Sequence, residues 1–311
     1  MPGDAMSSYR DLVLAVAQWT PLERFARRRG LRLGAARFVA GEHLRDGVRV
    51  AHEIAAAGKY PILDLLGEFI DTPERAESMA DGIRAAIDAL AEVTGPRMLS
   101  IKPTQVGLGI GRQVALDHLR PLAALAARLD VRIALDMEDH PRVDDTLAIL
   151  EELHDEGHTH VSTVLQSYLY RTSDDLDRLL ARTPVPELRL VKGAYKEPAS
   201  VAYADKADVD KSYRTLLERM LGGGGIVHVA SHDEAMIDAA RTQRDALGLP
   251  RERVTFQLLY GVKPRLQADL VRDGEAVGVY TPFGEDWYGY FTRRLAERPA
   301  NLAFVLRGLL G

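Results

Sequence analysis

The stretch VRIALDMED, residues 131–139, indicates the fold class. A short, almost uninterrupted apolar run is followed directly by Asp136, Glu138 and Asp139. Such a run is typical of a strand that is buried on both faces of a parallel sheet. Seven further runs of this kind occur along the chain: PILDLL (61–66), MLSIK (98–102), VSTVLQ (161–166), LRLVKG (188–193), GIVHVAS (225–231), VTFQLL (254–259) and AVGVYT (276–281). The sequence therefore predicts eight strands.

Helical patterns separate these runs. The segment TPERAESMADGIRAAIDALAEVTG opens at Thr72, a residue type that caps helices, and closes at Gly95. Repeated alternation of strand and helix predicts a parallel sheet, and eight such units over about 250 residues match a closed, TIM-like (β/α)8 barrel. An open, doubly wound α/β sheet is the alternative. We expect residues 1–58 to form an N-terminal helical prefix and residues 59–311 to form the barrel.

Composition narrows the class of protein. The 311-residue chain has 46% hydrophobic residues, 40 Lys and Arg against 45 Asp and Glu, and a net charge of −5. This charge argues against a dedicated nucleic-acid binder, because no excess of cations is available to displace phosphate counterions. The absence of cysteine excludes disulfides, thiolate metal sites and a cysteine nucleophile. Without a signal-peptide pattern or a long apolar run, we expect a cytoplasmic protein, and attachment to a membrane surface stays open.

Polar side chains stand at the carboxyl ends of the predicted strands. Each of them alone is more often an ordinary loop residue. In a barrel, however, all carboxyl ends of the strands meet at one mouth, where active sites form. The sequence therefore predicts a polar ring at this mouth. Its members are Glu68, Lys102, Asp136, Gln166, Lys192, Ser231, His232, Tyr260 and Tyr280.

The last predicted helix, GEDWYGYFTRRLAERP (residues 284–299), places Tyr290, Arg293, Arg294 and Glu297 on one face. Adjacent arginines usually face solvent, but a helix after the eighth strand would lie over the barrel mouth. Two guanidinium forks there match a carboxylate, and Lys102 could add a third cation. The pattern favours a small anion with an apolar body, such as an amino acid.

Five motifs resemble the proline dehydrogenase family in its short, monofunctional bacterial form. They are IKPTQVGLG, LDMED, LRLVKGAYKEP, VASHD and YTPFGEDWYGYFTRRLAERPANLAFVLR, and the resemblance runs from about Tyr60 to Arg307. It implies a distorted (β/α)8 barrel, with its C-terminal helix over the mouth, that binds FAD without a Rossmann domain. It also implies oxidation of L-proline to Δ1-pyrroline-5-carboxylate by hydride transfer to flavin N5, with electrons passed on to a quinone.

The resemblance assigns roles to residues that match the family's motifs. Asp136, Arg189 and Tyr280 are expected to be catalytic, and no residue identifies itself as the base that deprotonates the amine. Glu68 and Arg294 are expected to form an ion pair that closes over bound substrate. Proline is expected to contact Lys102, Tyr195, Tyr280, Tyr290, Arg293 and Arg294. FAD is expected to contact Met137, Gln166, Arg189, Val191, Lys192, Gly193, Ser231 and His232, where Ser231 replaces a common threonine and keeps its hydroxyl.

Other motifs carry weaker predictions. GLGIGR (residues 107–112) has G-x-G-x-G spacing rather than that of a dinucleotide loop, and is more typical of a strand-to-helix turn. GGGG (residues 222–225) follows a predicted helix and indicates its end. The histidines of HDEGHTH (residues 154–160) could be considered for zinc, but a solvated turn fits them better, and we predict no metal site.

A second class of function stays open from the residues alone. Lys102 and Lys192 at strand ends would also suit a flavin-free lyase or aldolase that forms a Schiff base, or a binding protein for an anionic metabolite. If the chain is a proline dehydrogenase, the family resemblance suggests a separate pyrroline-5-carboxylate dehydrogenase as a partner. It also suggests peripheral contact with the inner face of the cell membrane, for which the basic segment ARRRGLRLGAARF is a candidate that more often is a solvated face.

Overall fold

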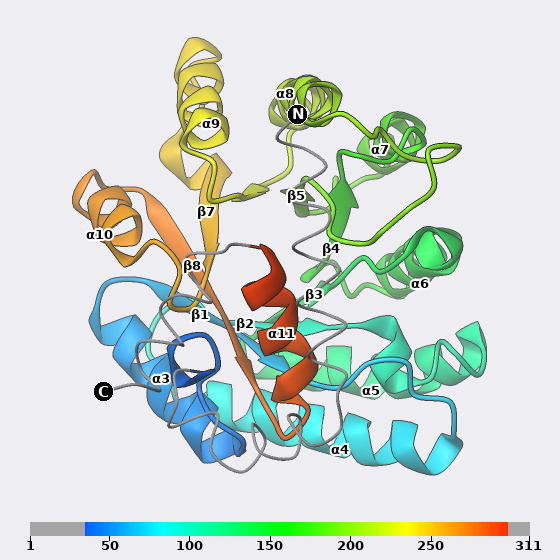
Figure 1. The fold of residues 1–311 in the computed structure, drawn as a ribbon. Helices are drawn as coiled ribbons and strands as arrows, with labels where there is room; N and C mark the ends of the chain where they lie inside the picture. The colour runs from blue at the N-terminus through cyan, green and yellow to red at the C-terminus, as the bar shows by residue number, and fades with distance from the viewer. Residues whose placement is uncertain (1–34, 298–311) are drawn as a thin grey trace.

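The computed structural model describes the backbone of residues 35–297 and the side chains of residues 35–292. Within this part of the chain, eight parallel strands form a closed barrel in sequence order (Figure 1). The strands are β1 (Tyr60–Leu65), β2 (Met98–Ile101), β3 (Arg132–Leu135), β4 (Val161–Gln166), β5 (Leu188–Val191), β6 (Val227–Ala230), β7 (Val254–Leu259) and β8 (Ala276–Phe283). The predicted (β/α)8 barrel is confirmed, and the open-sheet alternative is wrong because β1 pairs with β8 along six residues.

Helices connect consecutive strands and cover the outside of the barrel (Figure 1). They are α4 (Pro73–Leu90), α5 (Arg112–Arg128), α6 (Val143–Asp155), α7 (Thr172–Leu180), α8 (Lys206–Gly222), α9 (Glu234–Ala246) and α10 (Pro264–Arg272). Short 3-10 turns η1 (Ala35–Arg37), η2 (Pro103–Val106), η3 (His140–Arg142) and η4 (Arg251–Arg253) complete the described elements. Thr72 precedes α4 in extended conformation and Pro73 opens it, as expected for a helix N-terminus.

Two helices depart from the regular barrel pattern. Helix α3 (Leu44–Ala56) precedes β1 and packs across the seam between β1 and β8, where Gly47 lets it approach the Phe283 ring. Helix α11 (Trp287–Glu297) follows β8 but lies over the mouth (Figure 1). Its aromatic residues pack with Phe38, Val39 and Leu66, the last of which follows β1. The helix over the mouth is the predicted departure from a regular barrel, whereas the packing of α3 on the seam was not predicted.

The apolar core lies mainly between the strands and the outer helices. Inside the barrel, a much smaller cluster of Tyr60, Ile62, Met98 and Ala134 fills the end away from the mouth. Because side chains alternate along a strand, the next inward positions on β1 and β2 are Asp64 and Ser100. The interior therefore changes from apolar to polar toward the mouth.

The weaker motifs have structural roles. Gly107 adopts a left-handed conformation after η2 and α5 begins at Arg112, which makes GLGIGR a strand-to-helix turn. Helix α8 ends at Gly222, as predicted. The expectation of a solvated turn is wrong for His154, which is buried and whose Nε2 contacts the Val161 carbonyl at 2.7 Å. Among the helices that the structure describes, none has the length and apolar character needed to cross a bilayer.

Candidate active site

A network of buried polar side chains at the carboxyl ends of the strands centres on Asp136. Ser100 Oγ and Arg189 NH1 donate to Asp136 Oδ1 at 2.6 and 2.5 Å. The Tyr280 hydroxyl donates to Asp136 Oδ2 at 2.7 Å. These donors come from β2, β5 and β8, so the network connects strands from different sides of the barrel. The structure thus brings together the three residues predicted to be catalytic, Asp136, Arg189 and Tyr280.

Lys102 lies beside this network with its charge already compensated. Its Nζ donates to Asp64 Oδ1 at 2.8 Å and lies 3.8 Å from Asp136 Oδ2. The Tyr280 hydroxyl is within 3.4 Å of the same nitrogen. Lys102 and Asp64 are 8% and 1% exposed, which makes this a buried ion pair. Lys102 therefore has two carboxylates, Asp64 and Asp136, within 4 Å of its ammonium group.

The charges determine which forms these groups hold. Burial disfavours the ionised form of Asp136, but Arg189 and Lys102 outweigh it and lower the pKa of Asp136. Burial raises the pKa of Asp64 despite the attraction of Lys102. Burial would lower the pKa of Lys102, yet Asp64, Asp136 and Glu68 raise it above its ordinary value. Near neutral pH Lys102 is thus an ammonium ion and Asp136 a carboxylate.

The Arg189 side chain is restrained from the barrel interior as well as from the side of the mouth. Its Nε donates to Gln257 Oε1 at 2.6 Å, and Gln257 Nε2 donates to the Tyr60 hydroxyl at 3.1 Å. The guanidinium carbon lies 5.6 Å from the centre of the Tyr280 ring, within cation–π range. Because contacts on three sides restrain it, the guanidinium is a preorganised positive charge at the floor of the site.

Most of the predicted flavin contacts lie on or directly after β4, β5 and β6, which are neighbours in the ring. Gln166 Nε2 donates to the Glu138 carbonyl at 2.9 Å. Lys192 Nζ donates to Asp210 and Asp233 at 2.5 and 2.7 Å, so its charge is compensated within the protein. Gly193 has φ +120°, and an added Cβ would lie 2.3 Å from the Tyr168 ring. Only a glycine allows the chain to pass so close to that ring.

The remaining predicted flavin contacts are placed around the same arc. Ser231 Oγ accepts a bond from the Asp233 amide at 3.1 Å, and His232 Nε2 accepts one from the Leu259 amide at 3.0 Å. Met137 follows β3 and is buried, whereas Val191 ends β5 and is partly exposed. Ser231 and His232 thus already fix the β6–α9 loop against β7.

Glu68 and the tyrosines lie around the opening. Glu68 lies in the loop after β1 and Tyr195 in the loop after β5, both at the carboxyl ends of the strands. Burial raises the pKa of Tyr195, and the Glu68 carboxylate raises it further. Tyr290 is 7% exposed and belongs to the apolar cluster under α11. The backbone of Arg293 and Arg294 is part of α11, but their side chains lie outside the described residues. The clamp and the Glu68–Arg294 ion pair therefore stay predictions.

Sequence reasoning missed three members of the network, Asp64, Ser100 and Gln257. Each was counted as part of a strand's interior rather than as a strand end. Asp64 pairs with Ser100 in the β1–β2 register, so the two share the inward face. A charged residue at an inward position of an apolar run was the signal that could have found Asp64.

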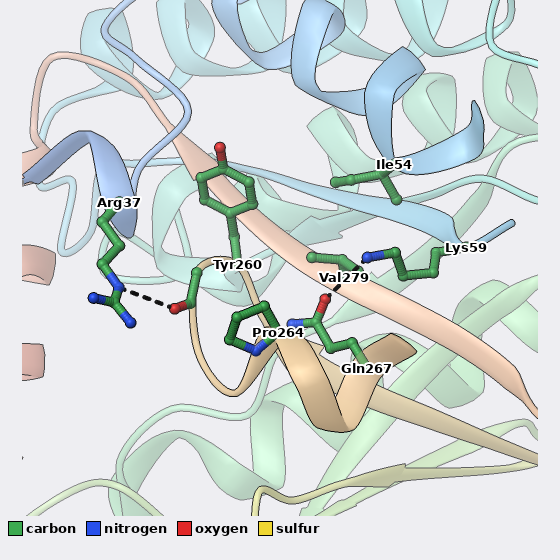
Figure 2. A pocket seen from close by; sticks show the side chains of 8 residues that line it. Arg37, Ile54, Lys59, Tyr260, Pro264, Gln267 and Val279 are labelled. Atoms are coloured by element: carbon green, nitrogen blue, oxygen red, sulfur yellow. Dashed lines mark hydrogen bonds between the residues drawn. The ribbon is translucent and has the colours of Figure 1, made fainter. Parts of the chain in front are cut away.

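A cavity of about 380 Å3 lies outside the barrel, between α3, α10 and β8 (Figure 2). Its lining residues are Arg37, Ile54, Lys59, Tyr260, Gly261, Pro264, Gln267 and Val279. Lys59 Nζ donates to Gln267 Oε1 at 3.3 Å, and Arg37 Nε donates to the Gly261 carbonyl at 3.4 Å. Strand β8 separates this cavity from the mouth, because Val279 packs with the outer core and Tyr280 with the inner cluster. The network at the mouth is therefore the candidate site.

A closed (β/α)8 barrel with a buried, charge-paired network at the carboxyl ends of its strands defines a barrel enzyme that acts on a small polar substrate. The sequence model of the family described as proline dehydrogenase matches residues 48–307. The chain belongs to the proline dehydrogenase family.

Curated relatives match nearly the whole chain. Proline dehydrogenase of Deinococcus radiodurans is 44% identical over 309 residues, covering 97% of this chain and 98% of the relative. Proline dehydrogenase 1 of Bacillus subtilis (strain 168) is 39% identical over 301 residues, covering 97% and 99%. Similarity at this level identifies the chain as an oxidoreductase of proline catabolism.

Solved structures share the fold. Proline utilization A from Bdellovibrio bacteriovorus, inactivated by N-propargylglycine, aligns with a TM-score of 0.78 and 23% identity over 84% of this chain and 32% of that one. A mutant of proline utilization A from Bradyrhizobium japonicum aligns with a TM-score of 0.75 over 93% and 33%. This chain therefore spans about a third of these larger proteins, and at such identity the match supports the barrel fold alone.

Proposed function

We propose that this proline dehydrogenase family enzyme converts L-proline to Δ1-pyrroline-5-carboxylate with FAD at the barrel mouth and a quinone as the final electron acceptor. The observation that carries the proposal is the division of the mouth into two arcs. Asp64 and Tyr280 stand on β1 and β8 and Lys102 directly follows β2, whereas Gln166 ends β4 and Lys192 follows β5. Asp136 and Arg189 join the two arcs by a direct bond of 2.5 Å. We assign the first arc to the substrate and the second to the cofactor.

The residues of the second arc fit a flavin nucleotide in their chemistry. They offer an amide at Gln166, a hydroxyl at Ser231 and a guanidinium at Arg189, together with the close backbone passage at Gly193. Bound FAD would supply the acceptor for the hydride that leaves the carbon next to the proline nitrogen. Arg189 would place a guanidinium beside the negative charge that develops there, although Asp136 compensates part of its charge. Lys192 contributes less, because Asp210 and Asp233 already compensate its charge.

The charge balance of the first arc supports a position for the proline carboxylate at α11. Lys102 and Arg189 are each paired with a buried aspartate, so within the described side chains these two cations leave no net positive charge for a second anion. Arg293 and Arg294 add two charges on the helix that crosses the mouth. Bidentate guanidinium contacts would hold the carboxylate and thereby orient the proline ring. Tyr280 and Tyr195 would wall the ring.

Single substitutions of the two arginines test this assignment. Arg293→Ala and Arg294→Ala should each raise KM for proline by about 30-fold or more while FAD stays bound, because a lost charge-assisted contact costs about 2 to 4 kcal/mol. Steady-state kinetics and flavin absorbance measure both quantities. Arg272→Ala, on the exposed end of α10, is the matched control and should change neither. Normal KM in both variants would exclude the clamp.

The colour of the purified protein tests the cofactor. We expect a yellow protein whose flavin absorbance bleaches when L-proline is added without oxygen. A colourless protein that cannot be reconstituted with FAD would instead support the lyase alternative. That alternative is disfavoured at Lys102, because a Schiff-base lysine needs a lowered pKa and the carboxylates around Lys102 raise it.

The remaining elements of the proposal concern partners. Reoxidation by a lipid-soluble quinone requires the enzyme to reach the membrane surface, so we propose a cytoplasmic enzyme with peripheral contact on the inner face. The product is unstable in water, which favours transfer to a separate pyrroline-5-carboxylate dehydrogenase. Sedimentation of the enzyme with quinone-containing vesicles, with vesicles lacking quinone as control, measures the first contact.

A further inference from the structure

Glu138 is a buried carboxylate that the proposed mechanism does not use. It follows β3, two residues after Asp136, and is 0% exposed. Both of its oxygens accept bonds from one residue, Thr104: the Thr104 amide donates to Oε2 at 3.0 Å and the Thr104 hydroxyl to Oε1 at 2.6 Å. Burying a carboxyl group is costly, and the two bonds from Thr104 offset that cost. We therefore look for a function of Glu138 in what Thr104 contacts.

Thr104 is also hydrogen-bonded to the β1–α4 loop, residues 66–72, and so links this loop to Glu138. The Thr104 hydroxyl accepts a bond from the Phe69 amide at 3.1 Å, and the Thr104 carbonyl accepts one from the Ile70 amide at 3.2 Å. The two amides directly after Glu68 are thus held by one threonine. That threonine is in turn fixed by Glu138.

The backbone of the β1–α4 loop needs these hydrogen bonds to keep its conformation. Phe69 has φ +55°, a left-handed conformation that costs a residue with a side chain about 1 kcal/mol or more and persists only where neighbours impose it. Its side chain is 48% exposed, so burial of the ring does not hold it in place. Arg142 stacks on the ring at 5.1 Å and is itself bonded to Asp139, the residue after Glu138. The β3–α6 loop therefore holds Phe69 by two routes.

We infer that Thr104 and Glu138 are positioning residues that hold the β1–α4 loop so that Glu68 faces the barrel mouth. This rests on the proposed function, in which Glu68 closes over bound proline. The threonine hydroxyl is the connecting atom, because it donates to Glu138 and accepts from Phe69 at the same time. Without it, the carboxylate keeps only the Thr104 amide, and the Phe69 amide loses its acceptor.

Thr104→Val removes this hydroxyl and keeps the shape of the side chain. In the protein without substrate, we expect hydrogen exchange of residues 66–72, measured by mass spectrometry, to become at least tenfold faster. We expect kcat/KM for proline to fall about tenfold through a higher KM, whereas general loss of folded enzyme would lower kcat and leave KM unchanged. Thr104→Ser, which restores the hydroxyl, should restore both values. Thr146→Val is the matched control, because Thr146 is buried in α6 and its hydroxyl has no hydrogen-bond partner in the described structure.

Glu138→Gln provides a second variant if Thr104→Val does not fold. The amide of glutamine offers one acceptor oxygen in place of two, so exchange in the loop should become at least threefold faster. Unchanged exchange in the variants that fold would overturn the inference, whatever the enzyme oxidises. Faster exchange with unchanged KM would also overturn it, because the loop would then be loosened without effect on substrate. If the wild-type enzyme oxidised no proline, the proposed function would fail, and the exchange data would still decide whether Thr104 holds the loop.

Discussion

Two carboxylates that follow β3 show how strongly the immediate surroundings decide the state of a residue. Asp136 contacts a guanidinium and lies near an ammonium, which together lower its pKa in spite of burial. Glu138 is buried more completely and accepts only neutral donors from Thr104, so burial dominates and raises its pKa to about 7. The first group is therefore a permanent charge in the site, whereas the second changes its charge near neutral pH.

The raised pKa of Glu138 predicts a pH dependence of stability. The folded protein holds this proton more tightly than the unfolded chain, whose carboxyl has the ordinary pKa of 4.5. The resulting stabilisation is fully present below pH 4.5 and is lost as the pH rises through about 7. Relative to Glu138→Gln, the wild type should lose about 3 kcal/mol of unfolding free energy between pH 5 and pH 8.

Urea unfolding of both proteins at the two pH values measures this difference. Glu77→Gln, on the exposed face of α4, is the control and should differ from wild type equally at both pH values. Parallel pH profiles for wild type and Glu138→Gln would mean that Glu138 remains ionised throughout.

At the scale of single elements, the loop after β5 determines how close the backbone comes to the cofactor arc. The chain turns at Gly193 with a positive φ and passes directly over the Tyr168 ring. The β4–β5 pairing continues into this turn, because the Ser167 and Tyr168 amides donate to the Val191 and Lys192 carbonyls at 2.9 Å. The turn and the ring are thus held together as a rigid edge of the site.

The substitution Gly193→Ala tests how tightly the turn packs on the Tyr168 ring, and Gly224→Ala is the matched control. Gly224 also has a positive φ, +100°, but no atom lies within 4 Å of a Cβ added there. Both substitutions strain the backbone, and only Gly193→Ala forces a methyl group into Tyr168. We expect Gly193→Ala to lower the free energy of unfolding by about 1 to 3 kcal/mol more than Gly224→Ala does. We also expect it to lower the FAD content of the purified protein. Equal unfolding free energies would show that Tyr168 moves aside without cost.

Elements were easier to predict than contacts. The runs VSTVLQ and VTFQLL coincide with β4 and β7, because continuous apolar runs are a direct mark of strands buried on both faces. Asp136 and Lys102 were found as well, because a strand end is visible in the sequence. Asp64 could not be recognised in this way, since its role depends on which face of β1 turns inward. The bond between Thr104 and Glu138 joins residues 34 positions apart, and neither residue type nor spacing indicates it.

At the scale of the whole molecule, the seam where β1 pairs with β8 is covered by a helix that precedes the barrel in the sequence. Helix α3 packs on β1 and β8 through Val50, Ala51 and Ile54, at the place where a regular barrel has the helix that follows its eighth strand. This frees α11 to lie over the mouth, where the proposed substrate clamp needs it. The two helices are therefore coupled: α11 can serve the site only because α3 covers the seam.

Truncation of the α3 contact should weaken the whole barrel. Ile54 is 5% exposed and borders both the seam and the outer cavity. Ile54→Ala should lower the free energy of unfolding by about 2 to 4 kcal/mol, because it removes buried methyl groups and leaves a gap. His52→Ala, on the exposed side of α3, should stay within about 0.5 kcal/mol of wild type in the same urea titration. A small loss for Ile54→Ala would mean that the β1–β8 hydrogen bonds close the barrel without help from α3.

The position of α3 has a consequence for synthesis on the ribosome. Its apolar stripe leaves the exit tunnel before β8, which supplies part of the surface that buries it and lies about 225 residues later in the chain. At about 5 to 20 residues per second, roughly 10 to 45 seconds pass before that strand is made. A nascent chain in this interval presents Val50 and Ile54 to solvent and to chaperones, and a polypeptide released before Ala276 never covers them. The stripe of α3 is therefore covered by both strands of the seam only once β8 has been synthesised.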